Sequence, residues 1–392
     1  MKQIHRTYKF RLYPNKEQET FLAQHFGCVR WIYNHFLNER KEQYQQTGKS
    51  DSYNKQSATL TQLKKQEETK WLADVNSQTL QTSLKNLDTA FNRFFKGLAQ
   101  FPKFKSRKSK NSFTVPQNLK LIDGKLYIPK LKTGIKTIVH REVKGNIQHC
   151  TISKTPTGKY FVSILSIEEY EPFKPVKKEI GIDLGIKEFL VTSEGEKFKN
   201  HKFTKKYERK LKTAQQHLSR KQKSSSQFEK QRLKVALIHE KITNSRLDTL
   251  HKISHKLVEE NNVIYLEDLN VKGMIKNRKL SKHIADCSWG TFVRQLEYKA
   301  NWNDRQLIKV DRWYPSSKTC NQCGYINQAL NLSVRQWTCP QCSTELDRDI
   351  NAAKNILAEG KRISAGTSDY TDGEVVRPSD RQTSKKSEAT HL

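Results

Sequence analysis

The spacing of apolar residues divides the chain into segments with different periodicities. Residues 8–12 alternate apolar and basic side chains as a short strand does, and Pro14 then ends that pattern. From there to about Gly97, apolar residues recur at three- and four-residue steps, as they do between Leu80 and Leu87. That period is typical of helices that pack on one face, so the sequence predicts a strand followed by a helical region.

The pattern changes to short alternating runs between Phe101 and Glu171. These runs are separated by turn sequences such as Asp123-Gly124, which predicts a small antiparallel barrel or sheet. The opening segment, residues 101–108, mixes aromatic and basic side chains. Such a mixture suits base stacking and phosphate contact, and it is equally consistent with a solvated linker.

From Glu179 onward the pattern predicts an α/β region. Residues 180–184 form a near-continuous apolar strand, and two further strands follow in a meander that ends near Phe198. A long basic stretch then predicts two helices joined near Ser224, the second with a core-facing stripe at Leu233, Leu237, Ile242, Leu247, Leu250, Ile253 and Leu257. The lysines opposite that stripe indicate either a solvated face or a groove for a polyanion.

The last part of the chain contains two more strands and a polar end. Residues 263–266 form a buried-type strand that ends at Glu267, and residues 307–310 form another that ends at Asp311. Residues 361–392 contain hardly any apolar side chains, so the sequence predicts a disordered tail there.

The net charge indicates which class of molecule the protein binds. Lysine and arginine outnumber aspartate and glutamate by 72 to 40, a formal net charge of +32, and the hydrophobic share is 35%. Such a surface repels itself unless a polyanion neutralises it, so nucleic acid is the expected partner. A basic protein of the membrane surface is the alternative, but no segment is apolar enough to span a bilayer and residues 1–11 lack the apolar core of a signal peptide. We therefore expect a soluble, cytoplasmic protein with no membrane partner.

Four of the seven cysteines have the spacing of a zinc site. Cys320 and Cys323 form one C-x-x-C pair, and after fifteen intervening residues Cys339 and Cys342 form another. Two such turns can complete a closed tetrahedron of thiolates, which predicts one structural Zn²⁺ with no open position for catalysis. The alternatives are disulfide pairs or unligated thiols.

Three acids recur at positions that suit a different cation. Asp183 lies within a strand, Glu267 ends a neighbouring strand, and Asp349 opens a helix. Carboxylates gathered between such elements could bind two Mg²⁺ or Mn²⁺ ions, as phosphodiester hydrolysis requires. Each acid also has a simpler interpretation, since Asp183 could pair with a lysine, Glu267 could be a surface acid and Asp349 could cap its helix. Asp347 competes with Asp349 for the third role.

These motifs together resemble the TnpB family of transposon-encoded RNA-guided DNA endonucleases, relatives of type V CRISPR effectors. The resemblance rests on Gly-Ile-Asp-Leu-Gly at 181–185, Leu-Glu-Asp-Leu at 266–269, the four cysteines, and Asp-Arg-Asp-Ile-Asn-Ala-Ala-Lys-Asn-Ile at 347–356. It extends through nearly the whole chain, with further similar segments at 11–14, 86–91, 101–104 and 289–300.

The resemblance implies a multidomain α+β fold. An N-terminal β-barrel wedge domain is interrupted by a helical recognition lobe, and an RNase H-like (RuvC) nuclease domain is interrupted by a zinc finger. The implied limits are 1–14 and 101–175 for the wedge, 15–100 for the lobe, 176–312 and 345–360 for the nuclease domain, 313–344 for the finger and 361–392 for the tail.

The resemblance also implies a function. A monomer would bind one structured guide RNA derived from the transposon end and cleave complementary double-stranded DNA in a prokaryotic cytoplasm or nucleoid, with Asp183, Glu267 and Asp349 holding Mg²⁺. The family's contacts to a short flanking DNA motif match Tyr53, Ser57 and Gln81, with Gln78 as a further candidate.

Other functions fit the sequence less well. An RNA-guided DNA-binding repressor without cleavage would not need all three acids. A transposase that joins strands through a His-x-His metal site is disfavoured because the sequence lacks such a pair. A zinc-dependent transcription factor leaves Asp183 unexplained.

Overall fold

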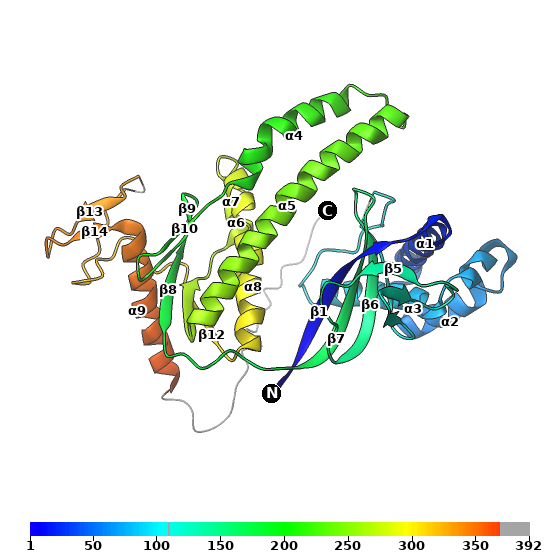
Figure 1. The fold of residues 1–392 in the computed structure, drawn as a ribbon, viewed down its shortest axis with the longest axis horizontal. Coiled ribbons are helices and arrows are strands. Elements are labelled where there is room, and N and C mark those ends of the chain that lie inside the picture. Colours follow the sequence, from blue (N-terminus) through cyan, green and yellow to red (C-terminus); the bar gives the residue numbers. More distant parts are fainter. Residues whose placement is uncertain (109, 332, 369–392) are drawn as a thin grey trace. The chain divides into compact units, whose positions relative to one another are not determined.

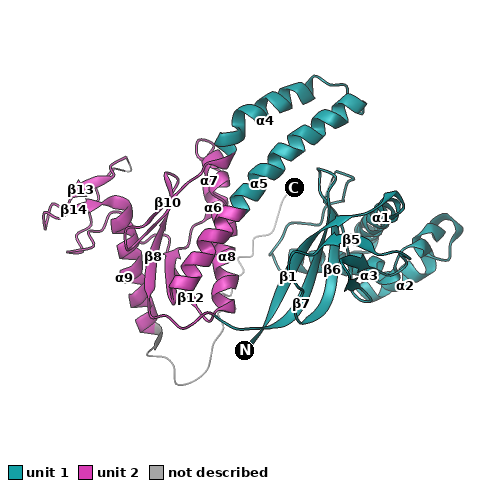
Figure 2. Cartoon of the chain, in the orientation of Figure 1, with its two compact units in different colours: residues 1–172, 204–247 teal, residues 173–203, 248–392 magenta. Residues whose placement is uncertain are grey.

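The computed structural model describes residues 1–108, 110–331 and 333–368, and it divides into two compact units (Figures 1 and 2). Unit 1 comprises residues 1–172 and 204–247, and unit 2 comprises residues 173–203 and the chain from Asp248 onward. The domain limits expected from the sequence place residues 204–247 with the nuclease domain instead, and those limits stay predictions. Within the described ranges, none of the helices is both long and apolar enough to span a membrane.

Unit 1 contains a seven-stranded antiparallel sheet with the order β2-β6-β7-β1-β5-β4-β3. Its longest pairing joins β1 to β7, in register from Lys2 opposite Tyr170 to Leu12 opposite Tyr160. The antiparallel sheet predicted from the alternating runs is therefore present, and β1 is longer than the predicted strand at 8–12. The strands are β1 (Lys2–Tyr13), β2 (Asn111–Val115), β3 (Lys120–Ile122), β4 (Lys125–Tyr127), β5 (Ile135–Ile138), β6 (Asn146–Lys154) and β7 (Tyr160–Tyr170).

Helices occupy the chain between β1 and β2, as the three- and four-residue spacing predicted. Asn15 and Gln18 form a capping box that starts the first helix directly after β1. Leu80, Leu84 and Leu87 are fully buried in the core that the helices share with the sheet. The elements are α1 (Lys16–Thr47), α2 (Tyr53–Leu63), the 3₁₀ helix η1 (Glu67–Asp74) and α3 (Ser77–Phe95).

A helical hairpin, α4 (Phe203–Ser219) and α5 (Ser226–Glu260), confirms the predicted turn near Ser224. The predicted apolar stripe on α5 is wrong at its start, because Leu233 and Leu237 are about two-fifths exposed, at 40% and 43%. Gln231 faces α4 there and donates a hydrogen bond to the Ala214 carbonyl at 2.9 Å. Further along, Ile242, Leu250 and Leu257 are buried as predicted.

Unit 2 is built on a five-stranded sheet with the order β10-β9-β8-β11-β12. The strands β8 (Glu179–Leu184), β9 (Glu188–Thr192) and β10 (Lys197–Lys199) form the predicted antiparallel meander, whereas β11 (Val263–Glu267) pairs in parallel with both β8 and β12 (Gln306–Val310). The remaining elements are α6 (Val271–Met274), α7 (Ser281–Cys287), α8 (Trp289–Trp302), β13 (Gln336–Thr338), β14 (Glu345–Asp347) and α9 (Arg348–Ser368).

The two faces of this sheet have different partners. Ile180, Ile182 and Ile264 pack into a core that includes side chains of α5, α7 and α8. Gly181 points the other way, toward α9, because successive residues of a strand face opposite sides. A β-carbon at Gly181 would lie 2.1 Å from the Ala353 carbonyl oxygen, so only glycine lets α9 approach this closely.

The helix α9 extends further than the sequence predicted. Residues 361–368 are helical, so the disordered tail is wrong for that stretch, and residues 369–392 lie outside the described residues. Contacts with the sheet stabilise the extension, since Lys361 forms an ion pair with Glu179 at 3.2 Å and Ile363 packs on the cluster that contains Tyr265.

The close approach at Gly181 yields a stability prediction. We expect Gly181→Ala to destabilise the chain by about 3 kcal/mol or more, because the added methyl must displace the backbone of α9. The change should appear as a lower urea midpoint in equilibrium unfolding. Gly290→Ala is the control, since, apart from its chain neighbours and its own helix backbone, no atom of the described residues lies within 4 Å of its β-carbon position. An alanine in a helix should leave stability unchanged or raise it. Equal midpoints for both variants would contradict the tight packing.

Candidate metal centres

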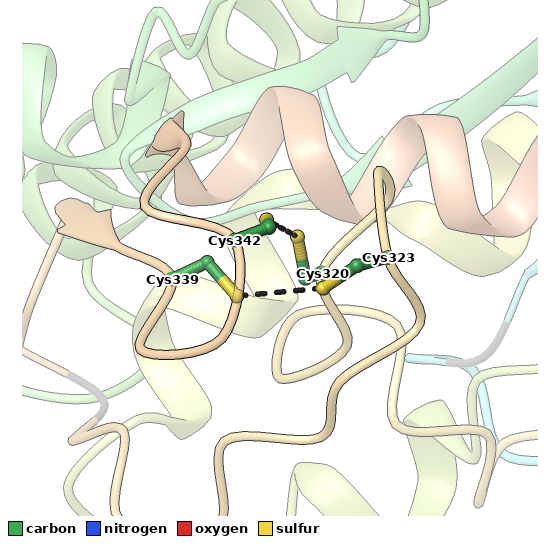
Figure 3. Close-up of side chains that lie close together, drawn as sticks. All are labelled: Cys320, Cys323, Cys339 and Cys342. Carbon is green, nitrogen blue, oxygen red and sulfur yellow. Dashed lines mark hydrogen bonds between the residues drawn. The ribbon is translucent and has the colours of Figure 1, made fainter.

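The four cysteines converge on one point (Figure 3). The Sγ atoms of Cys320 and Cys342 lie 3.6 Å apart, as do those of Cys323 and Cys339, and all four lie within 4.8 Å of one another. Zinc–sulfur bonds of about 2.3 Å in a tetrahedron separate the sulfurs by about 3.8 Å, whereas a disulfide needs about 2.05 Å. The cluster therefore suits a structural zinc ion and excludes disulfide pairing.

Both turns of the cluster use the same backbone geometry. The carbonyl of Cys320 accepts a hydrogen bond from the N–H of Gly324, and that of Cys339 accepts from the N–H of Ser343, each at 2.9 Å. Gly324 and Ser343 both adopt positive φ, at 79° and 57°. Hydrogen bonds from the hydroxyl and the N–H of Thr344 lower the pKa of Cys342 to about 6. The pKa of Cys323 is raised instead, because a hydrogen bond from the Tyr325 N–H is outweighed by burial and by the neighbouring thiols. Without a metal, the cluster therefore favours the thiolate at Cys342 over that at Cys323. The other three cysteines, Cys28, Cys150 and Cys287, are buried elsewhere.

The three predicted acids lie on three elements of unit 2. Asp183 is on β8 and Glu267 ends β11, and the parallel register pairs Gly181 with Tyr265 and Ile182 with Leu266. The next step of that register sets Asp183 beside Glu267, on the face that Gly181 presents to α9. Asp349 lies in the first turn of α9.

Asp347 has a different role from Asp349. Its Oδ1 accepts hydrogen bonds from the N–H groups of Asp349 and Ile350 at 3.0 and 3.1 Å, so Asp347 caps α9. Its Oδ2 pairs with Lys197 at 2.6 Å. The capping role considered for Asp349 therefore belongs to Asp347, and the Asp349 carboxylate instead accepts a hydrogen bond from Arg335 at 3.0 Å.

The negative charges of the three acids affect one another. Burial raises the pKa of Asp183 to about 7, and the charges of Glu267 and Asp349 add to the increase, while Arg348 and Arg335 oppose it. Burial also raises the pKa of Glu267, against a hydrogen bond from Ser316. Burial is thus the main cause of both raised pKa values, and for Asp183 the neighbouring acids add to it, as expected at a carboxylate site where no cation is bound.

The three carboxylates are further apart than the cysteine sulfurs. Among the described residues, the cysteine cluster is the one group of three or more potential ligands whose ligand atoms all lie within 4.8 Å of one another. A site for two ions about 3.5–4 Å apart does not require all three carboxylates to lie this close together, because each ion can be bound by only some of them.

Some neighbours of the acids could not be identified from the sequence. Ser316 donates a hydrogen bond to Glu267, which lies 49 residues earlier in the chain, and Arg335 pairs with Asp349 at 3.0 Å. Their only sequence signal is that Ser316 lies close to the first cysteine pair and Arg335 directly precedes β13. The exposed Trp313, at 84%, lies on the same loop as Ser316.

Two asparagines of α9 form hydrogen bonds with the first cysteine turn and with the loop that holds Ser316. Asn351 accepts a hydrogen bond from the Asn321 N–H at 2.9 Å and donates one to the Thr319 carbonyl at 2.7 Å. Asn355, one turn later, donates to the carbonyls of Ser316 and Thr319 at 2.7 and 2.6 Å. One helix thus carries Asp349 and also fixes the first cysteine turn.

The candidate flanking-motif residues lie on neighbouring helices of unit 1. Tyr53 and Ser57 are partly exposed on α2, and Gln78 and Gln81 are accessible on α3. The Lys85 ammonium of α3 lies 5.9 Å from the Tyr53 ring centroid, which brings the two helices together at this surface.

Three family models match parts of the chain. They are described as "Helix-turn-helix domain" over residues 1–49, "Probable transposase" over residues 161–278 and "Cas12f1-like, TNB domain" over residues 289–356. The first description differs from the structure, where residues 1–49 form the strand β1 and the single helix α1.

Two full-length relatives and one solved structure are also similar. A Streptomyces pristinaespiralis protein named "Putative RNA-guided DNA endonuclease" is 39% identical, over 93% of this chain and 92% of its own length. The Escherichia coli K12 protein "Putative RNA-guided DNA endonuclease InsQ" is 32% identical, over 91% and 93%. The structure described as "Cryo-EM structure of the Cas12f1-sgRNA-target DNA complex" has a TM-score of 0.55 at 14% identity, over 90% of this chain and 98% of that chain, which shows a common fold.

The cysteine cluster yields a metal-removal prediction. We expect Cys339→Ser to lower the zinc content from about one ion per chain to nearly none, because a closed four-thiolate site depends on every ligand. Zinc is measured by mass spectrometry of the purified protein, and near-ultraviolet circular dichroism reports the packing of Trp337 in the finger. Cys150→Ala, which removes a buried thiol outside the cluster, should keep the zinc. A fully zinc-loaded Cys339→Ser protein would contradict the assignment.

The raised pKa of Asp183 yields a pH prediction. An unfolded aspartate releases its proton near its ordinary pKa of 3.8, while the folded protein holds it to about pH 7. The folded state therefore binds more protons, and Asp183 makes the chain less stable as pH rises from about 4 to 7.

Asp183→Asn removes this effect. In buffer without divalent ions we expect equal melting temperatures for variant and native protein near pH 4. Near pH 8 the variant should melt higher by roughly 2–4 °C for each kcal/mol of relieved repulsion. A native protein that is the more stable of the two at pH 8 would show that Asp183 has a favourable partner instead.

Proposed function

Because the chain belongs to the TnpB family, we propose that it is an RNA-guided DNA endonuclease. It binds a structured guide RNA derived from the transposon end and cleaves complementary double-stranded DNA beside a short flanking motif. The observation that carries this proposal is the gathering of Asp183, Glu267 and Asp349 on one face of the unit 2 sheet. The full-length relatives named as RNA-guided DNA endonucleases support it.

Asp183, Glu267 and Asp349 would hold Mg²⁺ or Mn²⁺ at a single RuvC-like site. Two such ions, when bound, activate the attacking water and stabilise the leaving oxygen of the phosphodiester. Hard carboxylate oxygens select these cations over zinc, which the thiolates take. The protein's own contribution is to orient the ligands: Ser316 fixes Glu267 and Arg335 fixes Asp349 through the hydrogen bonds described above.

Each unit has features that support its proposed role. The three-strand meander followed by parallel strands, with α9 covering one face, supports an RNase H-like nuclease domain in unit 2. In unit 1, a sheet whose first strand is separated from the others by helices supports a wedge barrel interrupted by a recognition lobe.

The DNA and RNA partners are proposed from charge and position. Base pairing supplies sequence specificity in guided recognition, so the protein needs mainly phosphate-binding surface, which a net charge of +32 provides. Tyr53, Ser57, Gln78 and Gln81 would contact the flanking motif from α2 and α3. We propose one RNA per protein monomer.

The acids give a direct test of catalysis. We expect Asp183→Asn, Glu267→Gln and Asp349→Asn each to reduce cleavage of a guided target roughly a thousand-fold or more, since each removes a ligand of the proposed ions. Guide RNA and target DNA binding, measured by filter binding, should change little. Glu194→Gln is the control, because Glu194 is an exposed acid of unit 2 paired with Lys178. Unimpaired cleavage by Asp183→Asn would refute the site, whereas full binding without cleavage in the native protein would indicate the repressor.

The RNA partner can be tested separately. The protein is expressed together with its native flanking DNA, purified, and its bound nucleic acid is extracted and sequenced. We expect a discrete structured RNA with a variable 3′ end, which also supplies the guide for the cleavage assay. Heterogeneous RNA, or none, would indicate a protein that binds DNA directly.

A further inference from the structure

A groove with aromatic walls lies in unit 1, on α1 and η1. Its volume is about 610 Å³, and its lining includes Gln24, Gly27, Trp31, Asn34, His35 and Trp71. None of these residues belongs to the three acids, the cysteine cluster or the flanking-motif candidates. We call this feature the tryptophan groove.

Two tryptophans form a corner of the groove. The rings of Trp31 and Trp71 lie 5.3 Å apart between centroids at an interplanar angle of 80°, so two ring surfaces meet almost at a right angle. The His35 ring stacks on Trp31 at 4.5 Å and 9°, which fixes the orientation of that wall. Burial lowers the pKa of His35, so this stack is between neutral rings at neutral pH.

The second wall is held outward by its neighbours in η1. Leu72 is fully buried in the core of unit 1, while the adjacent Trp71 remains 37% exposed. The Trp71 indole N–H donates to the Glu68 carbonyl at 3.1 Å, within the same short helix. Trp71 is thus an exposed aromatic side chain held in a fixed position, so its ring can stack on a ligand and is not part of the core.

Gly27 keeps the groove open. It lies in the interior of α1, where glycine costs about 1 kcal/mol relative to alanine, and its φ is not in the left-handed region. Apart from its chain neighbours and the backbone of its own helix, no atom of the described residues lies within 4 Å of the position that its β-carbon would occupy. Neither backbone geometry nor packing against the described residues requires this glycine, and a larger side chain here would extend into the groove.

Polar groups at the groove match the edges of a nucleobase. Asn34 is fixed by a pair of hydrogen bonds with the backbone N–H and carbonyl of Lys105, both at 2.8 Å, which leaves each end of its amide able to form one more. Gln24 adds another amide and Arg30 adds a positive charge. Residue Lys105 belongs to the 101–108 segment, so at that point the segment docks at the groove and is not a free linker.

We propose that the tryptophan groove binds an unpaired nucleobase of a single-stranded nucleic acid. Aromatic walls supply stacking, which is favourable for every base, and the amides contact the base edge. The net charge of +32 makes a polyanion the expected occupant of a surface that combines aromatic and amide groups. The base belongs either to the guide RNA outside its paired regions or to a displaced DNA strand.

Stacking can be separated from phosphate binding with an abasic probe. Fluorescence anisotropy measures binding of the full chain to short oligomers of adenosine, of deoxyadenosine, and of abasic deoxyribose phosphate of equal length. We expect the native protein to bind the base-containing oligomers roughly 5- to 100-fold more tightly than the abasic oligomer. Tighter binding of the RNA oligomer identifies the guide RNA as the source, and tighter binding of the DNA oligomer identifies a DNA strand.

Two variants connect that preference to the groove. Gly27→Leu fills the space beside the tryptophans, and leucine is also a better helix former than glycine. Trp71→Ala removes one aromatic wall of the groove. Both variants should keep the native affinity for the abasic oligomer and lose the preference for base-containing oligomers. Trp71→Phe should restore most of it. Gly290→Leu, at a helical glycine of unit 2 that also has open space, is the matched control and should keep the preference. Thermal unfolding verifies that each variant is folded.

The proposal is overturned if the native protein binds abasic and base-containing oligomers equally, or if Gly27→Leu and Trp71→Ala both keep the native preference. Either result leaves the nuclease assignment untouched, because the oligomer assay requires no cleavage and no residue of the three acids. Conversely, loss of guided cleavage in Asp183→Asn has no bearing on binding at the groove.

Discussion

The contact between α9 and the sheet of unit 2 is the constraint on which both candidate metal centres depend. Gly181 lets the helix backbone approach β8, and the helix then presents Asp349 toward Asp183 and Glu267. The same helix is capped by Asp347, which leaves Asp349 available to the site. A side chain at position 181 would separate the helix from the sheet and the third acid from the other two.

Close packing brings negative charges together, and the repulsion between them is only partly offset by neighbouring positive charges. Three carboxylates share one region, and the arginines at 335 and 348 offset their repulsion without neutralising it. A fully compensated cluster would be more stable and would have less attraction for a cation. The residual negative charge is therefore consistent with a cation-binding site, and it destabilises the folded chain while no cation is bound.

Local pattern in the sequence was sufficient for much of this arrangement. A mid-strand aspartate between glycines, an acid at a strand end and a C-x-x-C pair are each visible within a few residues, because the strand period and the spacing of a cysteine pair are local properties.

Which face of a helix is buried depends instead on residues that are distant in the sequence. Leu233 and Leu237 have helical spacing, yet Gln231 faces α4 and the leucines stay exposed. The last turns of α9 likewise depend on Glu179 and Tyr265, which are about a hundred or more residues away. The tryptophan groove was hidden for the same reason, since it needs η1 to fold back on α1.

The asparagine pair on α9 limits how this fold can be rearranged. Asn351 binds the first cysteine turn, and Asn355 binds the loop whose Ser316 contacts Glu267. The four-cysteine segment is consequently not structurally independent of unit 2, into which it is inserted between β12 and α9. A finger transplanted from a distant relative must bring side chains that match this helix, or the graft will disturb the acid site even when it binds its own metal.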